Sequence, residues 1–333
     1  MNKKPKAVIA LVLTVLTVAL IIWTCFFSGG SYWVFDSQGP IGQAQKELII
    51  ITTVLASVVI LPVMVMTFVI IWRYRDRPDS KAKYKPHWDD SAKLETIWWG
   101  IPIIIIIAIG IITAKYTYDL EPSKPIASAQ KPITIQVSSL DWKWLFMYPD
   151  EGIATVNTLT IPEDVPVRFE LTSDAPMNSF WIPQLGGQIY TMSGMAMTLH
   201  LQADHPGTYY GSGANFSGEH FAQMRFDVNA VTSDQYNQWV QQAKQENNPL
   251  TEDGYTALAQ PGVGQKTTYS AFPEGLFQRI VTKYVVEGSE NPHGGHGAHA
   301  PAVTETASAE AAAKTASTAG NEEGQASHSS AGH

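Results

Sequence analysis

The sequence predicts an α+β membrane protein with a signal segment or anchor, a two-helix transmembrane hairpin, an outer β-barrel or β-sandwich, short C-terminal helices and a disordered tail. Three observations support this prediction. Two long, nearly uncharged stretches lie before residue 115, and short segments rich in Val, Ile, Thr and aromatic residues follow from residue 131. Residues 288–333 carry almost no large apolar side chains, so they cannot offset the entropy of ordering.

The two apolar stretches, residues 48–72 and 97–115, are predicted transmembrane helices. Each has about the length that crosses roughly 30 Å of hydrocarbon at 1.5 Å per residue. The isoleucine run at 103–107 makes a helix apolar on every face, whereas a core helix of a soluble protein usually has a polar side. Residues 73–96 then form the connecting loop, and 116–130 link the hairpin to the outer domain.

The N-terminus reads as an export signal, because lysines precede an apolar run within residues 1–24. Cys25 follows this run and is a candidate for lipidation, although Trp23 and Thr24 stand where small residues are usual. An uncleaved anchor with an inert thiol is the alternative. Lys and Arg residues cluster in 73–96 and mark that loop as cytoplasmic, so residues 25–47 and everything after the second helix lie outside.

The outer part divides into a β-domain at 131–230, a helical extension at 231–287 and the tail at 288–333. Candidate strands lie at 133–137, 158–161, 165–171 and 197–201, and Ser233 or Asp234 is expected to cap a helix that ends near Lys244. The net charge of −8 and the lack of clustered Lys and Arg in this part exclude a nucleic-acid partner. Five histidines in the tail could bind a transition metal loosely, but an ordinary solvated tail is the favoured interpretation.

Two motifs, at 94–102 (LETIWWGIP) and 141–144 (DWKW), together with the helix hairpin, give the chain a resemblance to subunit II of the haem–copper terminal oxidases. The likeness runs from about residue 35 to 285. It implies a cupredoxin-like barrel for the outer domain. In the members that oxidise cytochrome c, this barrel holds a two-copper centre, with ligands from a His before a Ser-Phe-Trp-type strand and from a C-x-E-x-C-x-x-x-H-x-x-M loop.

Residues 209–224 look like that metal-binding loop without its ligands. Only one family ligand, a methionine, is retained, and the single cysteine of the chain excludes two bridging thiolates, which such a soft copper pair requires. His220 lies one residue out of register, so a structural role is expected for it. Trp142 and Trp144 match aromatic residues near the electron-entry site and are expected to pack in the core. The degenerate copper positions are Asn178, Gly213, Asn215, Ser217, Phe221 and Met224.

Within the family, loss of this centre marks the quinol oxidases. Several short stretches of this sequence resemble the cytochrome bo ubiquinol oxidase branch. The resemblance then implies an accessory subunit II of a proton-pumping quinol oxidase in a bacterial inner membrane, with the outer domain in the periplasm. Haems, copper and the quinol site belong to subunit I, and no cofactor is expected in this chain. Its partners are subunit I, the other oxidase subunits, membrane lipid and, through subunit I, the quinol pool.

The resemblance places Glu95 at the position proposed in the family to feed protons into subunit I. The alternative is that this carboxylate only stabilises the first turn of its helix. Subunit II of this branch commonly begins as a lipoprotein precursor, which favours lipidation of Cys25. Two alternatives stay open: subunit II of an aa-type menaquinol oxidase, and a membrane-tethered copper-binding protein that acts through its His-rich tail. An electron carrier with a two-copper centre is excluded by the cysteine count.

Overall fold

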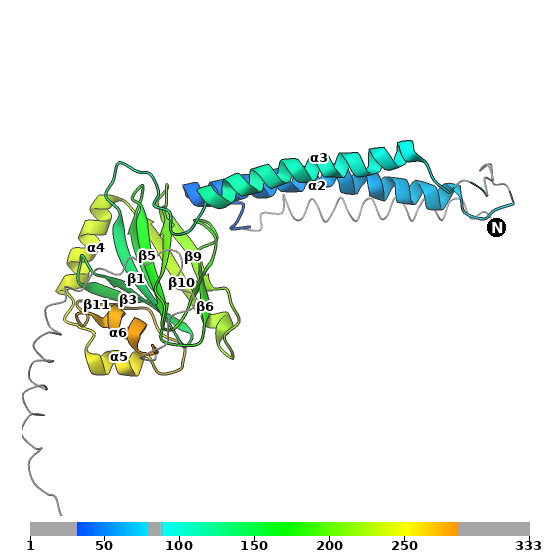
Figure 1. Ribbon diagram of the computed structural model, residues 1–333. Helices are drawn as coiled ribbons and strands as arrows, with labels where there is room; N and C mark the ends of the chain where they lie inside the picture. Colours follow the sequence, from blue (N-terminus) through cyan, green and yellow to red (C-terminus); the bar gives the residue numbers. More distant parts are fainter. Residues whose placement is uncertain (1–31, 79–86, 88, 286–333) are drawn as a thin grey trace, which may run out of the picture. The chain divides into compact units, whose positions relative to one another are not determined.

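The computed structural model describes residues 32–78, 87 and 89–285 (Figure 1). The predicted signal segment, Cys25 and the His-rich tail lie outside these residues. Within them, two long helices precede a domain of two β-sheets, and three short helices follow the last strand of the second sheet. This order agrees with the fold class that the sequence predicts.

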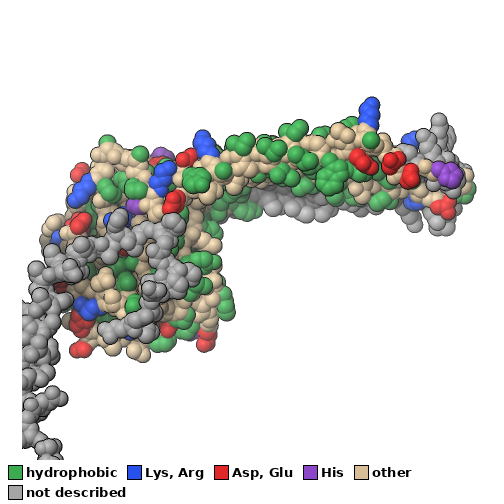
Figure 2. All heavy atoms as spheres, in the orientation of Figure 1, with side chains coloured by type: hydrophobic (Ala, Val, Ile, Leu, Met, Phe, Trp, Pro, Cys, Tyr) green, Lys and Arg blue, Asp and Glu red, His purple; other side chains and the backbone are tan. Residues whose placement is uncertain are grey.

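The hairpin consists of α2 (Pro40–Arg73) and α3 (Ala92–Asp119), which run side by side (Figure 1). Both helices are long and apolar enough to cross a membrane. They are longer than the apolar stretches in the sequence, because more polar residues extend α2 at its N-terminal end and α3 at both ends. On the face shown in Figure 2, hydrophobic side chains cover the hairpin and charged side chains lie mostly near its ends. That distribution suits helices whose middle contacts lipid or other apolar helices.

The β-domain contains a 6-stranded sheet in the order β11-β3-β2-β1-β5-β8 and a 5-stranded sheet in the order β4-β10-β9-β6-β7. Most neighbouring strands are antiparallel, and the pairs β1 with β5 and β10 with β4 are parallel. The strands are β1 (Ile133–Leu140), β2 (Lys143–Tyr148), β3 (Ile153–Val156), β4 (Thr158–Pro162), β5 (Val167–Ser173), β6 (Asn178–Trp181), β7 (Ile189–Thr191), β8 (Met197–Leu201), β9 (Gly207–Gly213), β10 (Arg225–Val231) and β11 (Thr267–Tyr269).

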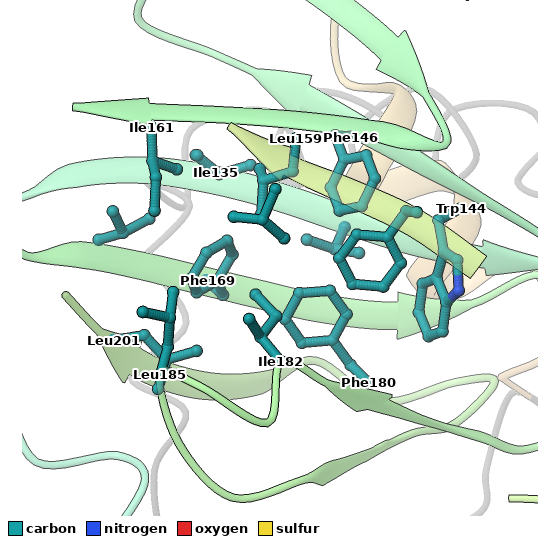
Figure 3. Close-up of a cluster of buried hydrophobic side chains, with 14 of the residues drawn as sticks. Ile135, Trp144, Phe146, Leu159, Ile161, Phe169, Phe180, Ile182, Leu185 and Leu201 are labelled. Atoms are coloured by element: carbon teal, nitrogen blue, oxygen red, sulfur yellow. The ribbon is translucent and has the colours of Figure 1, made fainter. Parts of the chain in front are cut away.

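A core of aliphatic and aromatic side chains fills the space between the two sheets. Figure 3 shows Trp144 and Phe146 of β2, Phe169 of β5 and Phe180 of β6 projecting into this space. Phe180 and Phe226 stack with ring centroids 5.2 Å apart, and Trp144 meets Phe180 edge to face at 5.4 Å. Such aromatic pairs add about 0.5–1.5 kcal/mol each beyond the burial of their area. The core therefore fixes the strands that lead to the loop at 213–224.

The six-stranded sheet is covered on both faces, which explains why every residue of β2 is buried. Alternate side chains of β2, such as Trp144 and Phe146, point to the core between the sheets. Leu145 and Met147 point the other way, into a second cluster formed with the C-terminal extension. The extension contains α4 (Ser233–Gln245), α5 (Glu252–Leu258) and α6 (Leu276–Thr282).

The predicted helix is present as α4, but its cap is Thr232 and it begins at Ser233, so the expected caps Ser233 and Asp234 lie inside the first turn. The Thr232 hydroxyl accepts from the backbone N–H of Gln235, and the Gln235 side chain accepts from the backbone N–H of Thr232. This reciprocal arrangement satisfies two backbone donors at once. Asp234 is left near the N-terminal end of the helix dipole, where a negative charge is favourable.

The segment that enters α2 is hydrogen-bonded to the β-domain. The backbone N–H of Gln38 donates to the Gln184 carbonyl at 2.7 Å, and that of Gly42 donates to the Leu185 carbonyl at 2.9 Å. A Cβ on Gly39 would lie 2.0 Å from the carbonyl oxygen of Gln202. Glycine is therefore required there by the close approach of two backbones.

Candidate functional site

The candidate site lies where β6 and β9 meet the loop that leads through η1 (Phe221–Gln223) to β10. Asn178 is the first residue of β6, Gly213 is the last of β9, and Met224 directly precedes β10. Asn178 is 2% exposed and Met224 is 0% exposed, whereas Ser217 on the connecting loop is half-buried. Strand ends thus hold three of the six predicted positions, and the loop supplies the others.

The side-chain amide of Asn178 stands at the centre of this site. Its Nδ2 donates to Ser217 Oγ at 3.1 Å and to Met224 Sδ at 2.8 Å. Its Oδ1 accepts from the backbone N–H of Ser179 at 2.8 Å. Because both ends of the amide have partners, this buried group is satisfied without any external ligand.

Gly213 lies against the same amide. A Cβ at this position would be 2.7 Å from Asn178 Oδ1 and 3.3 Å from Met224 Sδ, so Asn178 occupies the space that a side chain would need. The available donors are an amide, a hydroxyl and a thioether, and no thiolate is among them. Two thiolates are needed to bridge a soft copper pair, so these residues do not fit a two-copper centre. Across the described part of the chain, no three His, Cys, Asp or Glu side chains gather as a metal site.

Asn215 and Phe221, the remaining predicted positions, do not join the Asn178 cluster. Asn215 Nδ2 donates to the Met177 carbonyl at 3.3 Å, and the ring of Phe221 packs on Phe216 with centroids 5.7 Å apart. His220, the neighbour of Phe221, instead packs edge-on against Trp142 at 4.9 Å. The structural role expected for His220 is therefore a ring contact that braces the loop.

Trp142 has a left-handed backbone with φ of 61°, which is uncommon for a bulky residue. Its indole Nε1 donates to the Ser217 carbonyl at 3.1 Å, and a Cβ on Gly218 would lie 3.3 Å from its ring. Trp142 is half-buried: it packs against the edge of the core and also contacts the loop. Trp144, in contrast, is fully buried, which confirms the prediction of core packing for that residue.

Glu95 lies in the first turn of α3, and its backbone N–H donates to the Ser91 carbonyl at 2.9 Å. Its side chain is exposed in this structure. The position lies at the opposite end of α3 from the link to the β-domain, away from the Asn178 site along the chain. Sequence analysis thus indicates two unrelated candidate sites, and the structure does not bring them together.

One buried functional group was missed by the sequence analysis. Asp174, in the loop between β5 and β6, accepts hydrogen bonds from side chains that lie 81, 109 and 110 residues further along the chain. No short motif could indicate such partners, because the contacts depend on where the C-terminal extension folds back. The helix α5 that carries one partner does have a local signal, since Thr251 caps it and two acidic residues follow.

An apolar helix hairpin followed by a two-sheet domain, with a degenerate metal loop at one end, defines the class of membrane-anchored oxidase subunits with a cupredoxin-like domain. Three family models match in chain order. The cytochrome c oxidase subunit II transmembrane domain matches residues 30–115, its periplasmic domain matches 151–231, and the COX aromatic rich motif matches 244–288. The chain belongs to the cytochrome oxidase subunit II family, and it is a membrane protein with an outer domain.

Its relatives include quinol-using members of this family. Cytochrome bo(3) ubiquinol oxidase subunit 2 of Pseudomonas putida is 45% identical over 258 residues, which cover 77% of this chain and 82% of that protein. The protein of the same name from Pseudomonas aeruginosa is 44% identical over 276 residues, with 82% of each chain covered. Quinol oxidase subunit 2 of Bacillus cereus is 46% identical over 238 residues, which cover 72% of this chain and 82% of that protein.

Proposed function

We propose that this chain is subunit II of a proton-pumping respiratory quinol oxidase, which oxidises ubiquinol and reduces oxygen to water. The observation that carries this proposal is the Asn178 cluster, in which an amide fills the space beside Gly213 and no thiolate is present. A domain of this kind cannot hold the two-copper centre through which a cytochrome would deliver electrons. The names of the Pseudomonas relatives support ubiquinol as the electron donor.

In this proposal the redox chemistry takes place in subunit I, which holds the haems, the copper and the quinol site. This chain contributes support and no cofactor. Its two helices pack against subunit I in a bacterial inner membrane, and the outer domain covers the periplasmic face of that subunit. The apolar side chains along α2 and α3 support the helix contacts, because polar groups are scarce over most of both helices.

Glu95 is the one residue of this chain that we propose to act in proton entry. It is an exposed carboxylate in the first turn of α3, on the side of the membrane where the Lys and Arg residues of the connecting loop indicate cytoplasm. Ionisable groups at the entrance of a membrane-spanning segment often mark proton paths. A carboxylate there can collect protons and pass them to an acceptor in the partner subunit.

The proposal is tested by purifying the complex through an affinity tag on this chain. We expect a haem-containing subunit to copurify and oxygen uptake to depend on added ubiquinol. Oxygen uptake with menaquinol alone would assign the chain to the menaquinol branch. The name of the Bacillus relative, quinol oxidase subunit 2, does not specify the quinol and so allows this outcome. Purification of the tagged chain without any haem protein would contradict the proposal.

A membrane-tethered copper-binding protein is distinguished by removing the tail. Deleting residues 288–333 leaves the hairpin and the β-domain intact, so an oxidase subunit should still assemble and support the same oxygen uptake. A protein that acts through the tail histidines should lose its function with this deletion. Equal turnover of the truncated and full-length complexes would therefore favour the oxidase subunit.

A further inference from the structure

The loop that leads into the Asn178 site begins with a buried carboxylate. The side chain of Asp174 is 0% exposed and accepts three hydrogen bonds. Tyr255 Oη donates to Oδ2 at 2.5 Å, whereas Lys283 Nζ and Tyr284 Oη each donate to Oδ1 at 2.7 Å. A buried carboxylate requires such donors, because an unpaired charge in the interior is strongly destabilising.

These three donors come from two distant parts of the C-terminal extension. Tyr255 lies in α5, and Lys283 and Tyr284 follow α6. Between them the extension adds β11 to the edge of the six-stranded sheet, and its apolar side chains, including Leu250, Leu276 and Phe277, cover that sheet. We call residues 250–285 the strap. Both ends of the strap are thus fastened to one carboxylate.

The electrostatics of the strap agree with this arrangement. Burial raises the pKa of the Tyr255 phenol, and the hydrogen bond to Asp174 raises it further. The hydrogen bond to Asp174 is also the main cause of the raised pKa of the Lys283 amine. Both donors therefore keep their protons at neutral pH.

The other side of Asp174 leads directly to the candidate site. Only Ala175, Pro176 and Met177 separate it from Asn178, which binds Ser217 and Met224. The backbone N–H of Asp174 donates to the Ser139 carbonyl at 2.9 Å. The carbonyl of Met177 accepts from Asn215. The strap is thus hydrogen-bonded to one end of the segment 174–177, and the loop at 213–224 is hydrogen-bonded to the other end.

We propose that the strap has a defined task, which is to position Asn178. Its two tyrosines and Lys283 fix Asp174, and Asp174 fixes the short loop that sets where β6 begins. Asp174 is thereby a positioning residue for the Asn178 cluster. In a domain whose loops are joined by an amide, a hydroxyl and a thioether, the strap supplies the restraint that keeps these weak hydrogen bonds aligned. This inference concerns the outer domain itself and stands whichever quinol the complex uses.

The test is hydrogen exchange, measured by mass spectrometry on the full chain within the purified oxidase complex. In Asp174→Asn, we expect exchange to speed up by about tenfold or more in peptides that contain residues 174–178 and 213–218, as loss of hydrogen bonds to a buried charge predicts. Tyr255→Phe and Lys283→Met should each produce a smaller increase in the same peptides. Lys283→Arg retains a cationic donor and should restore exchange close to that of the unchanged chain.

The matched control is Glu252→Gln, which removes a carboxylate from the same extension. Glu252 pairs with Arg279 at 2.5 Å, but its side chain is 65% exposed, so exchange near Asn178 should stay the same. If Asp174→Asn does not assemble, the comparison of Lys283→Met with Lys283→Arg decides the question. The proposal is overturned if the strap variants loosen residues 276–285 while residues 174–178 and 213–218 exchange as before.

Discussion

Asn178 Nδ2 lies 2.8 Å from Met224 Sδ, so an amide and a thioether join two strands at the end of the β-domain. Both side chains are buried, and Gly213 approaches the same amide closely enough to leave no room for a Cβ. Met224 is the family's ligand position that this chain retains, and here the structure gives its sulfur a neutral N–H donor. The site is therefore held by hydrogen bonds, and its packing depends on the smallest residue at position 213.

Gly213→Ala tests this packing. The added methyl group would lie 2.7 Å from Asn178 Oδ1, so we expect the free energy of unfolding of the outer domain to fall by about 1–3 kcal/mol. Urea unfolding of the chain in detergent, followed by tryptophan fluorescence, measures this change. In the double variant with Asn178→Ala, the methyl group at position 213 no longer meets the Asn178 oxygen. The losses of unfolding free energy in the two single variants should therefore not add. Strictly additive losses would show that Gly213 and Asn178 are not in conflict over this space.

The pH dependence of stability is dominated on the alkaline side by buried tyrosines. Burial, with a smaller contribution from Tyr148 and Glu151, raises the pKa of Tyr236 above its ordinary value of 10.0. The unfolded phenol then ionises while the folded one keeps its proton, so stability is complete below pH 10 and falls as the pH rises beyond it. Each such group should lower the free energy of unfolding by about 1 kcal/mol between pH 10 and 11.

Tyr236→Phe should make this alkaline decline less steep, because the variant has no phenol to ionise in the unfolded state. Urea unfolding at pH 8, 10 and 11 provides the measurement. Tyr190 is 49% exposed and gives the matched control Tyr190→Phe. In this variant, the free energy of unfolding should fall with pH as it does in the unchanged chain. An identical slope in the Tyr236 and Tyr190 variants would contradict the assignment.

Glu95→Gln, in the assembled oxidase, separates proton entry from helix stabilisation. If the carboxylate feeds protons to subunit I, turnover and proton uptake should slow by about tenfold or more, as removal of a positioned proton-transfer group does. If it only favours the helix dipole, the loss is about 0.3–1 kcal/mol of helix stability, and turnover does not change. Asp90→Asn removes a nearby carboxylate that precedes α3 and serves as the control. Unchanged turnover in Glu95→Gln would remove the proton-entry role.

The fold was predictable because local patterns determine most of it. Uninterrupted apolar stretches indicate α2 and α3, and the strands observed at Thr158–Pro162 and Met197–Leu201 follow the predicted segments closely. Strands β2, β3, β6, β7, β9 and β10 are not among the predicted segments, and residues 209–213, read as loop in the sequence, belong to β9. Of the other elements that were not predicted, α5 and β11 are short and depend on tertiary contacts. Strand β11 has only three residues, and it is a strand because it pairs with β3. Sequence periodicity over so few residues cannot identify it.

The candidate site was predictable only in part. The family pattern indicated which residues stand at the degenerate positions, and the structure brings Asn178, Gly213, Ser217 and Met224 together. The family pattern could not indicate that the Asn178 amide would fill the space beside Gly213, because that contact depends on side-chain orientation. Asp174 escaped notice for a related reason: its donors are distant in the sequence and meet it only after the strap has folded onto the sheet.

The central claim is that electrons bypass this chain, and copper reconstitution tests it most directly. A chain that ends at residue 287, without the tail histidines, is purified, incubated with copper under reducing and oxidising conditions, and freed of unbound metal. We predict no visible absorption band and no stoichiometric copper, since the site offers one thioether and no thiolate. An intense visible band with two copper ions bound per chain would contradict the account.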